Sequence, residues 1–138
     1  MILRCKESGW DGVPVTEYKD EPGTWVGVTR RALTADAVGP GRAFETRYFE
    51  IAPGGYTTFE KHAHEHCVIV LRGRGHVFLD KEWHELGPFD VVNVGPWVPH
   101  QFANKSEEPF GLVCIVDKIR DKPCPLGKAT PVEASEEK

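Results

Sequence analysis

The sequence predicts an all-β fold built as a single domain. Three observations support this prediction: the chain length, the share of glycine and proline, and the spacing of short apolar runs. A chain of 138 residues is long enough for one buried core and too short for two ordinary domains. Its 14 glycines and 11 prolines favour many turns. Apolar runs recur about every ten residues, which is the spacing of a sandwich or a barrel.

Runs rich in β-branched and aromatic residues are expected to form the strands, because these side chains fit a pleated, half-buried surface. In chain order the expected strands are Trp25 to Leu33, Phe44 to Ile51, Tyr56 to Phe59, Cys67 to Leu71, His76 to Leu79, Val91 to Val94, His100 to Asn104 and Phe110 to Val116. Turn signals separate them at Gly39 to Gly41, Pro53 to Gly55, Arg72 to Gly75, Asp80 to Glu82, Gly87 to Asp90, Gly95 to Pro96 and Lys105 to Pro109. No segment has convincing helix caps, and the two alternatives left open are one weak turn at Arg31 to Val38 and a short C-terminal helix.

The two ends of the chain have a mixed polar composition without sustained periodicity. We therefore expect an N-terminal arm at residues 1–23, a barrel at 24–117 and a C-terminal tail at 118–138. Apolar residues outside a core often mark an interface, and the arm with Trp10, together with the nearby Trp25, predicts a homodimer.

The overall charge argues against several classes of partner. A formal net charge of −4 and a pI near 5.9 give no positive field for a nucleic acid or an anionic membrane. No stretch approaches 18 apolar residues, and the N-terminus lacks an apolar signal core, so we expect a cytoplasmic protein. The four cysteines form no CxxC pair, which favours reduced thiols.

A cluster of imidazoles is the strongest functional signal. Glu60, His62, His64 and His66 occupy every second position, and alternate positions of a strand share one face. His100 lies at the start of another expected strand, which a barrel could bring close. Neutral imidazole with a carboxylate suits a divalent transition metal, whereas a solvated polar strand face is the simpler alternative.

The cluster resembles the first motif of the cupin superfamily, which reads glycine, HxH, Glu and a closing glycine. Counting back from the closing glycine puts the family's Glu position at His66 and its two His positions at His62 and Glu60. The chain thus resembles a cupin in which His and Glu are exchanged. His100 and Asn104 match the second motif. The resemblance covers about residues 42 to 117 and implies an antiparallel jelly-roll barrel with one metal inside.

The resemblance implies Glu60, His62, His66 and His100 as the metal ligands, with His64 as the alternative to Glu60. Four protein ligands leave open positions on an octahedral ion, and open positions mark a catalytic centre. Manganese or iron is the first expectation, and nickel, cobalt and zinc remain alternatives.

Cys114 is the candidate nucleophile. The alternation of Phe110 to Val116 puts it on the expected interior face, where inert packing is the alternative role. Longer strings extend the resemblance to about residues 24 to 125: Glu45 to Gly55, Val70 to Gly75, Trp97 to Phe102, Leu112 to Val116 and Arg120 to Pro123. They are similar to small bacterial cupins that include the 1-methylthio-D-xylulose 5-phosphate methylsulfurylases. In that family a metal, usually manganese, polarises a ketone, a cysteine takes the methylthio group, and a thiol reductant releases methanethiol. The resemblance implies that Cys114 is this cysteine.

The expected function is therefore metal-assisted cleavage of a carbon–sulfur bond in a small methylthio-ketose phosphate. A cupin dioxygenase or decarboxylase and a non-catalytic small-molecule-binding cupin are the alternatives. Phosphate would need cationic donors at the barrel mouth, for which Arg47, Arg72 and Arg74 are candidates.

Overall fold

The computed structural model describes residues 1–7, 9–34 and 42–127, which contain β-strands and no helix. The strands are β1 (Cys5–Lys6), β2 (Gly9–Trp10), β3 (Thr16–Glu17), β4 (Val26–Ala32), β5 (Phe44–Tyr56), β6 (Glu60–Lys61), β7 (His66–Arg72), β8 (Gly75–Leu79), β9 (Glu82–Leu86), β10 (Val91–Val94), β11 (Gln101–Ala103), β12 (Phe110–Asp117) and β13 (Cys124–Pro125). The predicted all-β class is confirmed.

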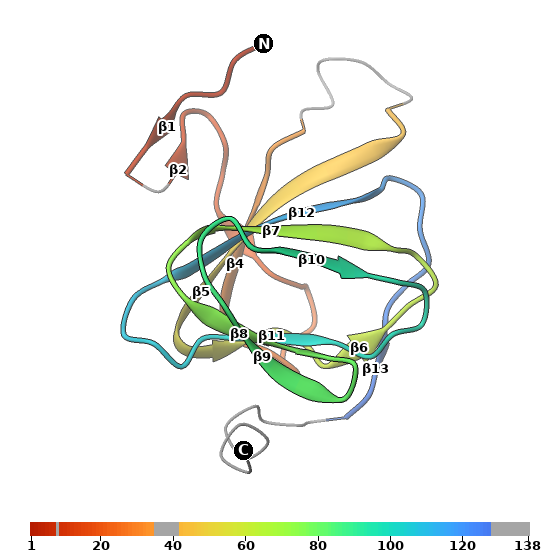
Figure 1. Ribbon diagram of the computed structural model, residues 1–138. Helices are drawn as coiled ribbons and strands as arrows, with labels where there is room; N and C mark the ends of the chain where they lie inside the picture. The colour runs from red at the N-terminus through yellow and green to blue at the C-terminus, as the bar shows by residue number, and fades with distance from the viewer. Residues whose placement is uncertain (8, 35–41, 128–138) are drawn as a thin grey trace.

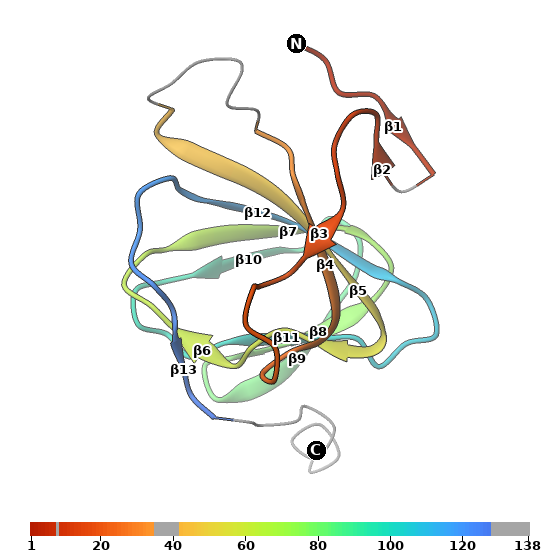
Figure 2. The same cartoon turned by 180° about the vertical axis from the view of Figure 1, so that it is seen from behind.

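One antiparallel sheet forms the body of the molecule. Its strand order is β10-β7-β12-β5-β11-β8-β9, and β4 pairs with both β5 and β3. The long strand β5 pairs with β12 along its first half and with β11 at its end, so it connects two parts of the sheet. The sheet curls into a barrel around these connections, while β1 and β2 form a separate hairpin beside it (Figure 1; Figure 2).

The barrel interior is apolar at one end and polar at the other. The apolar cluster consists of Val28, Phe49, Ile51, Val68, Val70, Val77, Leu86, Val92, Val94, Phe102, Phe110, Leu112, Cys114 and Val116. Val68 and Val70 alternate with outward residues along β7, as the period of two requires. Burial of these side chains supplies the main driving force for closing the barrel. The polar end holds the imidazoles.

The structure corrects three strand predictions. The predicted strand Tyr56 to Phe59 is wrong, because β5 ends at Tyr56 and residues 57–59 connect it to β6. The predicted turn at Pro53 to Gly55 is wrong, since β5 continues to Tyr56 and bends at Gly54, whose φ is +81°. Strand β9 was not predicted, because its two buried residues, Trp83 and Leu86, are three positions apart and give no alternating pattern.

The closing glycine of the histidine motif, Gly73, has a structural reason to be glycine. Its φ is +72°, and a Cβ atom there would lie 2.2 Å from the carbonyl oxygen of Pro109. Any larger residue would force the turn between β7 and β8 away from Pro109, the residue before β12.

The N-terminal segment contributes to the barrel. Tyr18 and Trp25 pack against the core, and Trp10 contacts the ring of Tyr48. Among the described residues, no helix is long and apolar enough to cross a membrane. The domain boundaries and the homodimer stay predictions. The short C-terminal helix that the sequence left open does not occur in residues 118–127, and residues 128–138 lie outside the described part of the chain.

Candidate metal centre

Two distant segments meet at the polar end of the barrel. An isolated antiparallel bridge joins Glu60 to His100: the amide of Glu60 donates to the His100 carbonyl at 3.1 Å, and the reverse bond is 3.0 Å. The amide of Trp97 also donates to the carbonyl of His62 at 2.7 Å. These backbone contacts fix the loop after β6 against the turn before β11, and so bring the side chains of both motifs together.

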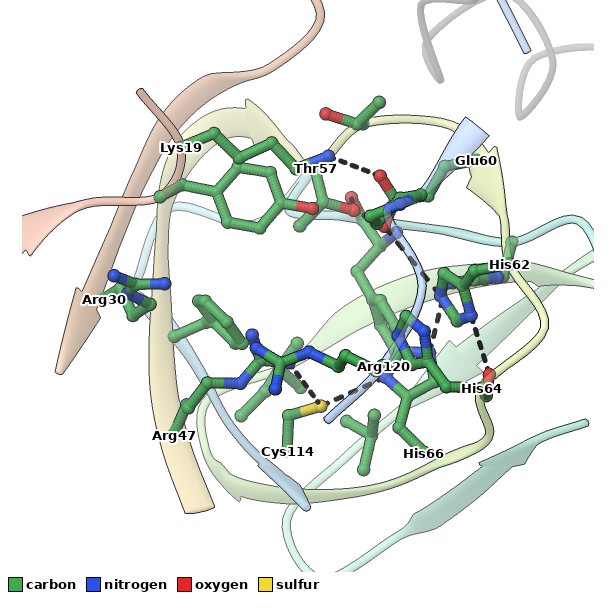
Figure 3. Close-up of a pocket in the computed structure, with 18 residues that line it drawn as sticks. Lys19, Arg30, Arg47, Thr57, Glu60, His62, His64, His66, Cys114 and Arg120 are labelled. Atoms are coloured by element: carbon green, nitrogen blue, oxygen red, sulfur yellow. Dashed lines mark hydrogen bonds and ion pairs between the residues drawn. The ribbon is translucent and has the colours of Figure 1, made fainter. Parts of the chain in front are cut away.

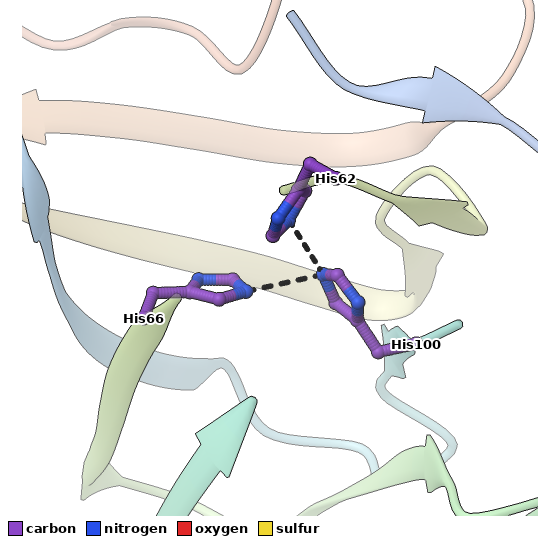
Figure 4. Close-up of side chains that lie close together, drawn as sticks. All are labelled: His62, His66 and His100. Atoms are coloured by element: carbon purple, nitrogen blue, oxygen red, sulfur yellow. Dashed lines mark hydrogen bonds between the residues drawn. The ribbon is translucent and has the colours of Figure 1, made fainter. Parts of the chain in front are cut away.

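Three of the predicted ligands converge. The Nε2 atom of His100 lies 3.2 Å from Nε2 of His62 and 3.1 Å from Nε2 of His66 (Figure 4). The ligating atoms of all three rings lie within 4.8 Å of one another. Two nitrogens on adjacent positions of an octahedral ion are roughly 3 Å apart when each metal–nitrogen bond is about 2.1 Å. The spacing therefore suits one ion bound by three imidazoles.

The opposite nitrogens of these rings determine which tautomer is present. Nδ1 of His62 lies 2.7 Å from the carbonyl oxygen of His64, and Nδ1 of His100 lies 2.8 Å from that of Val98. Since a carbonyl only accepts, both Nδ1 atoms carry the hydrogen and both Nε2 atoms present lone pairs to each other. Facing lone pairs repel unless a cation lies between them, so the donor set fits a metal ion.

Burial keeps the three rings neutral. It lowers the pKa of His62, and it lowers the pKa of His100 to about 4. Burial, aided by the neighbouring His100, lowers the pKa of His66 to about 2. Neutral rings have the free lone pair that coordination requires, so no proton competes for the site at pH 7.

Glu60 lies beside this group but outside it. One carboxylate oxygen forms an ion pair with Lys19, and the other lies 4.0 Å from Nε2 of His62. The Glu60 side chain is 8% exposed, which makes the Lys19 ammonium its essential counter-charge. Sequence reasoning missed Lys19, because a lysine in a loop 41 residues away carries no motif.

His64 also lies outside the three-imidazole group. Its ring stacks on that of His62 with centroids 3.7 Å apart and planes 6° apart. Asp121 accepts hydrogen bonds from the amides of Ala63 and His64, and its Oδ1 lies 2.8 Å from Nδ1 of His64. The hydrogen bond from the Ala63 amide is the main reason that the pKa of Asp121 lies below its ordinary value. Asp121, which sequence reasoning also missed, thus holds the loop that carries two of the imidazoles.

Cys114 faces the interior, on the side of the imidazole cluster. Its Sγ lies 3.0 Å from Nδ1 of His66 and accepts a hydrogen bond from Arg47 at 3.5 Å. Burial raises the pKa of the Cys114 thiol, and the Arg47 charge opposes that increase. All four cysteines are free in the structure.

A cavity of about 200 Å³ opens beside these groups (Figure 3). Its lining includes the metal-site imidazoles, Glu60 and Cys114, together with four cationic side chains, Lys19, Arg30, Arg47 and Arg120. Of the three arginines considered in the sequence, only Arg47 lines it. Arg72 instead pairs with Glu50 at 2.8 Å, and Arg74 packs against Gly87. The cavity has the size and mixed lining of a site for a small polar molecule.

Known proteins resemble this chain over most of its length. Residues 47–116 match the family model described as a cupin domain. A protein of Rhodospirillum rubrum named 1-methylthio-D-xylulose 5-phosphate methylsulfurylase is 40% identical over 115 residues, 83% of this chain and 72% of its own length. A solved cupin-2 domain of Rhodospirillum rubrum is 34% identical, with a TM-score of 0.79 over 99% of this chain and 90% of its own. A cupin 2 conserved barrel domain protein of Rhodopseudomonas palustris is 32% identical, with a TM-score of 0.83 over 99% and 93%.

Proposed function

The chain belongs to the cupin domain family, and on that basis we propose that it is a metal-dependent enzyme that cleaves a carbon–sulfur bond. The proposed substrate is a small methylthio-ketose phosphate, and the released product is methanethiol. The observation that carries this proposal is the contact between Sγ of Cys114 and the ring of His66, inside a cavity that four imidazoles line. The name of the Rhodospirillum rubrum relative supports the same chemistry.

We propose that the ion is held by His62, His66 and His100, with Glu60 as the fourth ligand through the oxygen nearer His62. Lys19 would then hold the other carboxylate oxygen, as partners of metal-ligating carboxylates commonly do. Manganese or iron is preferred, with nickel, cobalt and zinc as alternatives. A bound divalent ion supplies a Lewis acid beside the ketone oxygen of the substrate.

In the proposed reaction Cys114 acts as the nucleophile. Its thiolate attacks the methylthio sulfur, and the bond between that sulfur and the adjacent carbon breaks. The electron pair of the broken bond moves onto the ketone to give an enolate, which takes up a proton and becomes a methyl ketone. Cys114 is left as a methyl disulfide. Two molecules of a small thiol then reduce this disulfide, which releases methanethiol, restores Cys114 and forms the oxidised reductant.

The environment of Cys114 supports this role. When Nε2 of His66 donates its lone pair to an ion, Nδ1 of that ring carries the hydrogen and donates it toward Sγ. Arg47 donates to the same sulfur from the other side. Two donors stabilise a thiolate more than a thiol, and so they oppose the increase in the thiol pKa that burial causes.

The first test replaces the sulfur. In Cys114→Ser we expect methanethiol release from the methylthio-ketose phosphate to stop, while metal content stays at the wild-type level. Cys67→Ser is the matched control, because Cys67 lies on the neighbouring strand β7 and does not line the cavity. Unchanged turnover in Cys114→Ser would exclude the role of this cysteine and would favour an oxygen-dependent reaction at the same centre.

The second test addresses the ligands. His62→Ala and His100→Ala proteins, purified without a metal-affinity column, should lose stoichiometric metal in elemental analysis. Metal retained at one ion per chain in both variants would contradict the proposed centre.

A further inference from the structure

The cationic side chains of the cavity differ in whether a carboxylate balances them. Two of the four are balanced: Lys19 pairs with Glu60, and Arg120 pairs with Glu45 at 2.8 Å and also donates to two backbone carbonyls. Arg30 and Arg47 form no ion pair with any carboxylate in the described ranges 1–7, 9–34 and 42–127. The cavity therefore contains two unbalanced positive charges, although the whole chain carries a net charge of −4.

The Nε atoms of Arg30 and Arg47 are buried and have no hydrogen-bond partner among the residues that the structure describes. A buried donor without an acceptor is unfavourable, and the cost rises when the donor belongs to a charged group. An anion in the cavity would supply both the acceptor oxygens and the missing negative charge.

Strand register puts the two arginines on the same inner face. Arg30 of β4 pairs with Phe49 of β5, and Arg47 lies two residues before Phe49, so the arginines are diagonal neighbours. Arg47 in turn pairs with Cys114 of β12, and its guanidinium lies 5.0 Å from the ring centroid of Phe49. Figure 3 shows Arg30 on the side of the cavity away from the imidazoles, and Arg47 near Cys114.

We propose that Arg30 and Arg47 bind the phosphate group of the substrate, at the end of the cavity opposite the three imidazoles. This assignment rests on the proposed function for the rest of the substrate. Arg30 contacts only the anion and determines the preference for a phosphorylated ketose. Arg47 has a second contact, with Sγ of Cys114, so it links anion binding to the reacting thiol.

A binding experiment tests the assignment without any turnover. Calorimetry on the full-length, metal-loaded protein would compare three ligands: inorganic phosphate, D-ribulose 5-phosphate, and D-ribulose without the phosphate. The wild type should bind the phosphorylated ketose more tightly than ribulose, and Arg30→Met should weaken binding of the phosphorylated ketose by roughly 10- to 100-fold. Arg30→Lys should give an intermediate affinity, since it keeps the charge and loses the paired geometry.

Arg72→Met is the matched control, because Arg72 also projects from a barrel strand but pairs with Glu50 and does not line the cavity. Its affinity for D-ribulose 5-phosphate should equal that of the wild type. Circular dichroism and metal content establish that each variant is folded, and if Arg30→Met fails to fold, the comparison of Arg30→Lys with wild type decides. The assignment is overturned if the folded Arg30 variants bind as the wild type does, or if the wild type binds neither phosphate compound.

Kinetics with the methylthio-ketose phosphate separate the two arginines. Arg30→Met should raise KM with little change in kcat, whereas Arg47→Met should raise KM and lower kcat. Binding that depends on Arg30 without any methanethiol release would refute the proposed reaction and leave the anion site standing. Methanethiol release that does not change when Arg30 is replaced would refute the anion site and leave the proposed reaction standing.

Discussion

The ion pair between Lys19 and Glu60 gives a quantitative test of how the N-terminal segment is tied to the site. Lys19→Met removes the counter-charge of a carboxylate whose side chain is only 8% exposed. Breaking a fully buried pair typically costs about 3–5 kcal/mol. The Lys19 side chain is 28% exposed, so the loss should be smaller, about 2–3 kcal/mol of the free energy of unfolding.

Urea unfolding of the metal-free, full-length protein provides the measurement, with Lys19→Met, Glu60→Gln and the double variant forming a cycle. The double variant should recover much of the loss, because no buried charge remains. Lys122→Met, which removes an exposed pair with Glu21, should cost less than about 0.5 kcal/mol. A Lys19→Met effect below about 0.5 kcal/mol at pH 7 would refute the reasoning.

Three further predictions concern the buried imidazoles, Asp121 and Gly73. The unfolded chain binds protons at its imidazoles near pH 6.5, whereas burial lowers the pKa of His100 to about 4 and that of His66 to about 2. The metal-free protein should therefore lose about 1–2 kcal/mol of its free energy of unfolding per imidazole as the pH falls from 6.5 to 5, measured by urea unfolding. A flat profile over that range would contradict the burial of these rings. Asp121→Ala removes the carboxylate that accepts hydrogen bonds from His64 and its loop. This variant should bind metal roughly 10- to 100-fold more weakly than the wild type in a chelator competition. Equal affinities would show that the loop keeps its shape without the carboxylate. Gly73→Ala places a Cβ atom 2.2 Å from a backbone carbonyl oxygen, at a residue whose φ is +72°. The variant should lower the free energy of unfolding by more than about 2 kcal/mol. Wild-type stability would disprove the tight turn.

The sequence by itself determined the fold class and the central group of imidazoles. Alternating apolar residues and turn residues are local signals, and they located most strands of the barrel correctly. The resemblance to the cupin motifs selected Glu60, His62, His66 and His100, and the structure brings the ligating atoms of the three imidazoles to within 4.8 Å of one another. The predicted strand face that would align Glu60, His62, His64 and His66 is wrong, because residues 62–65 form a loop between β6 and β7. The loop conformation, and not strand alternation, separates His62 from His64.

Only the tertiary structure decided what surrounds those imidazoles. Lys19 reaches Glu60 across 41 positions of sequence, and Asp121 reaches the His64 loop across 57. Arg30 replaces Arg72 and Arg74 among the cavity cations, because strand register turns it inward. Solvent-exposed and cavity-lining charges look identical in a sequence. Closure of the barrel is what removes some of them from water and gives each a particular partner.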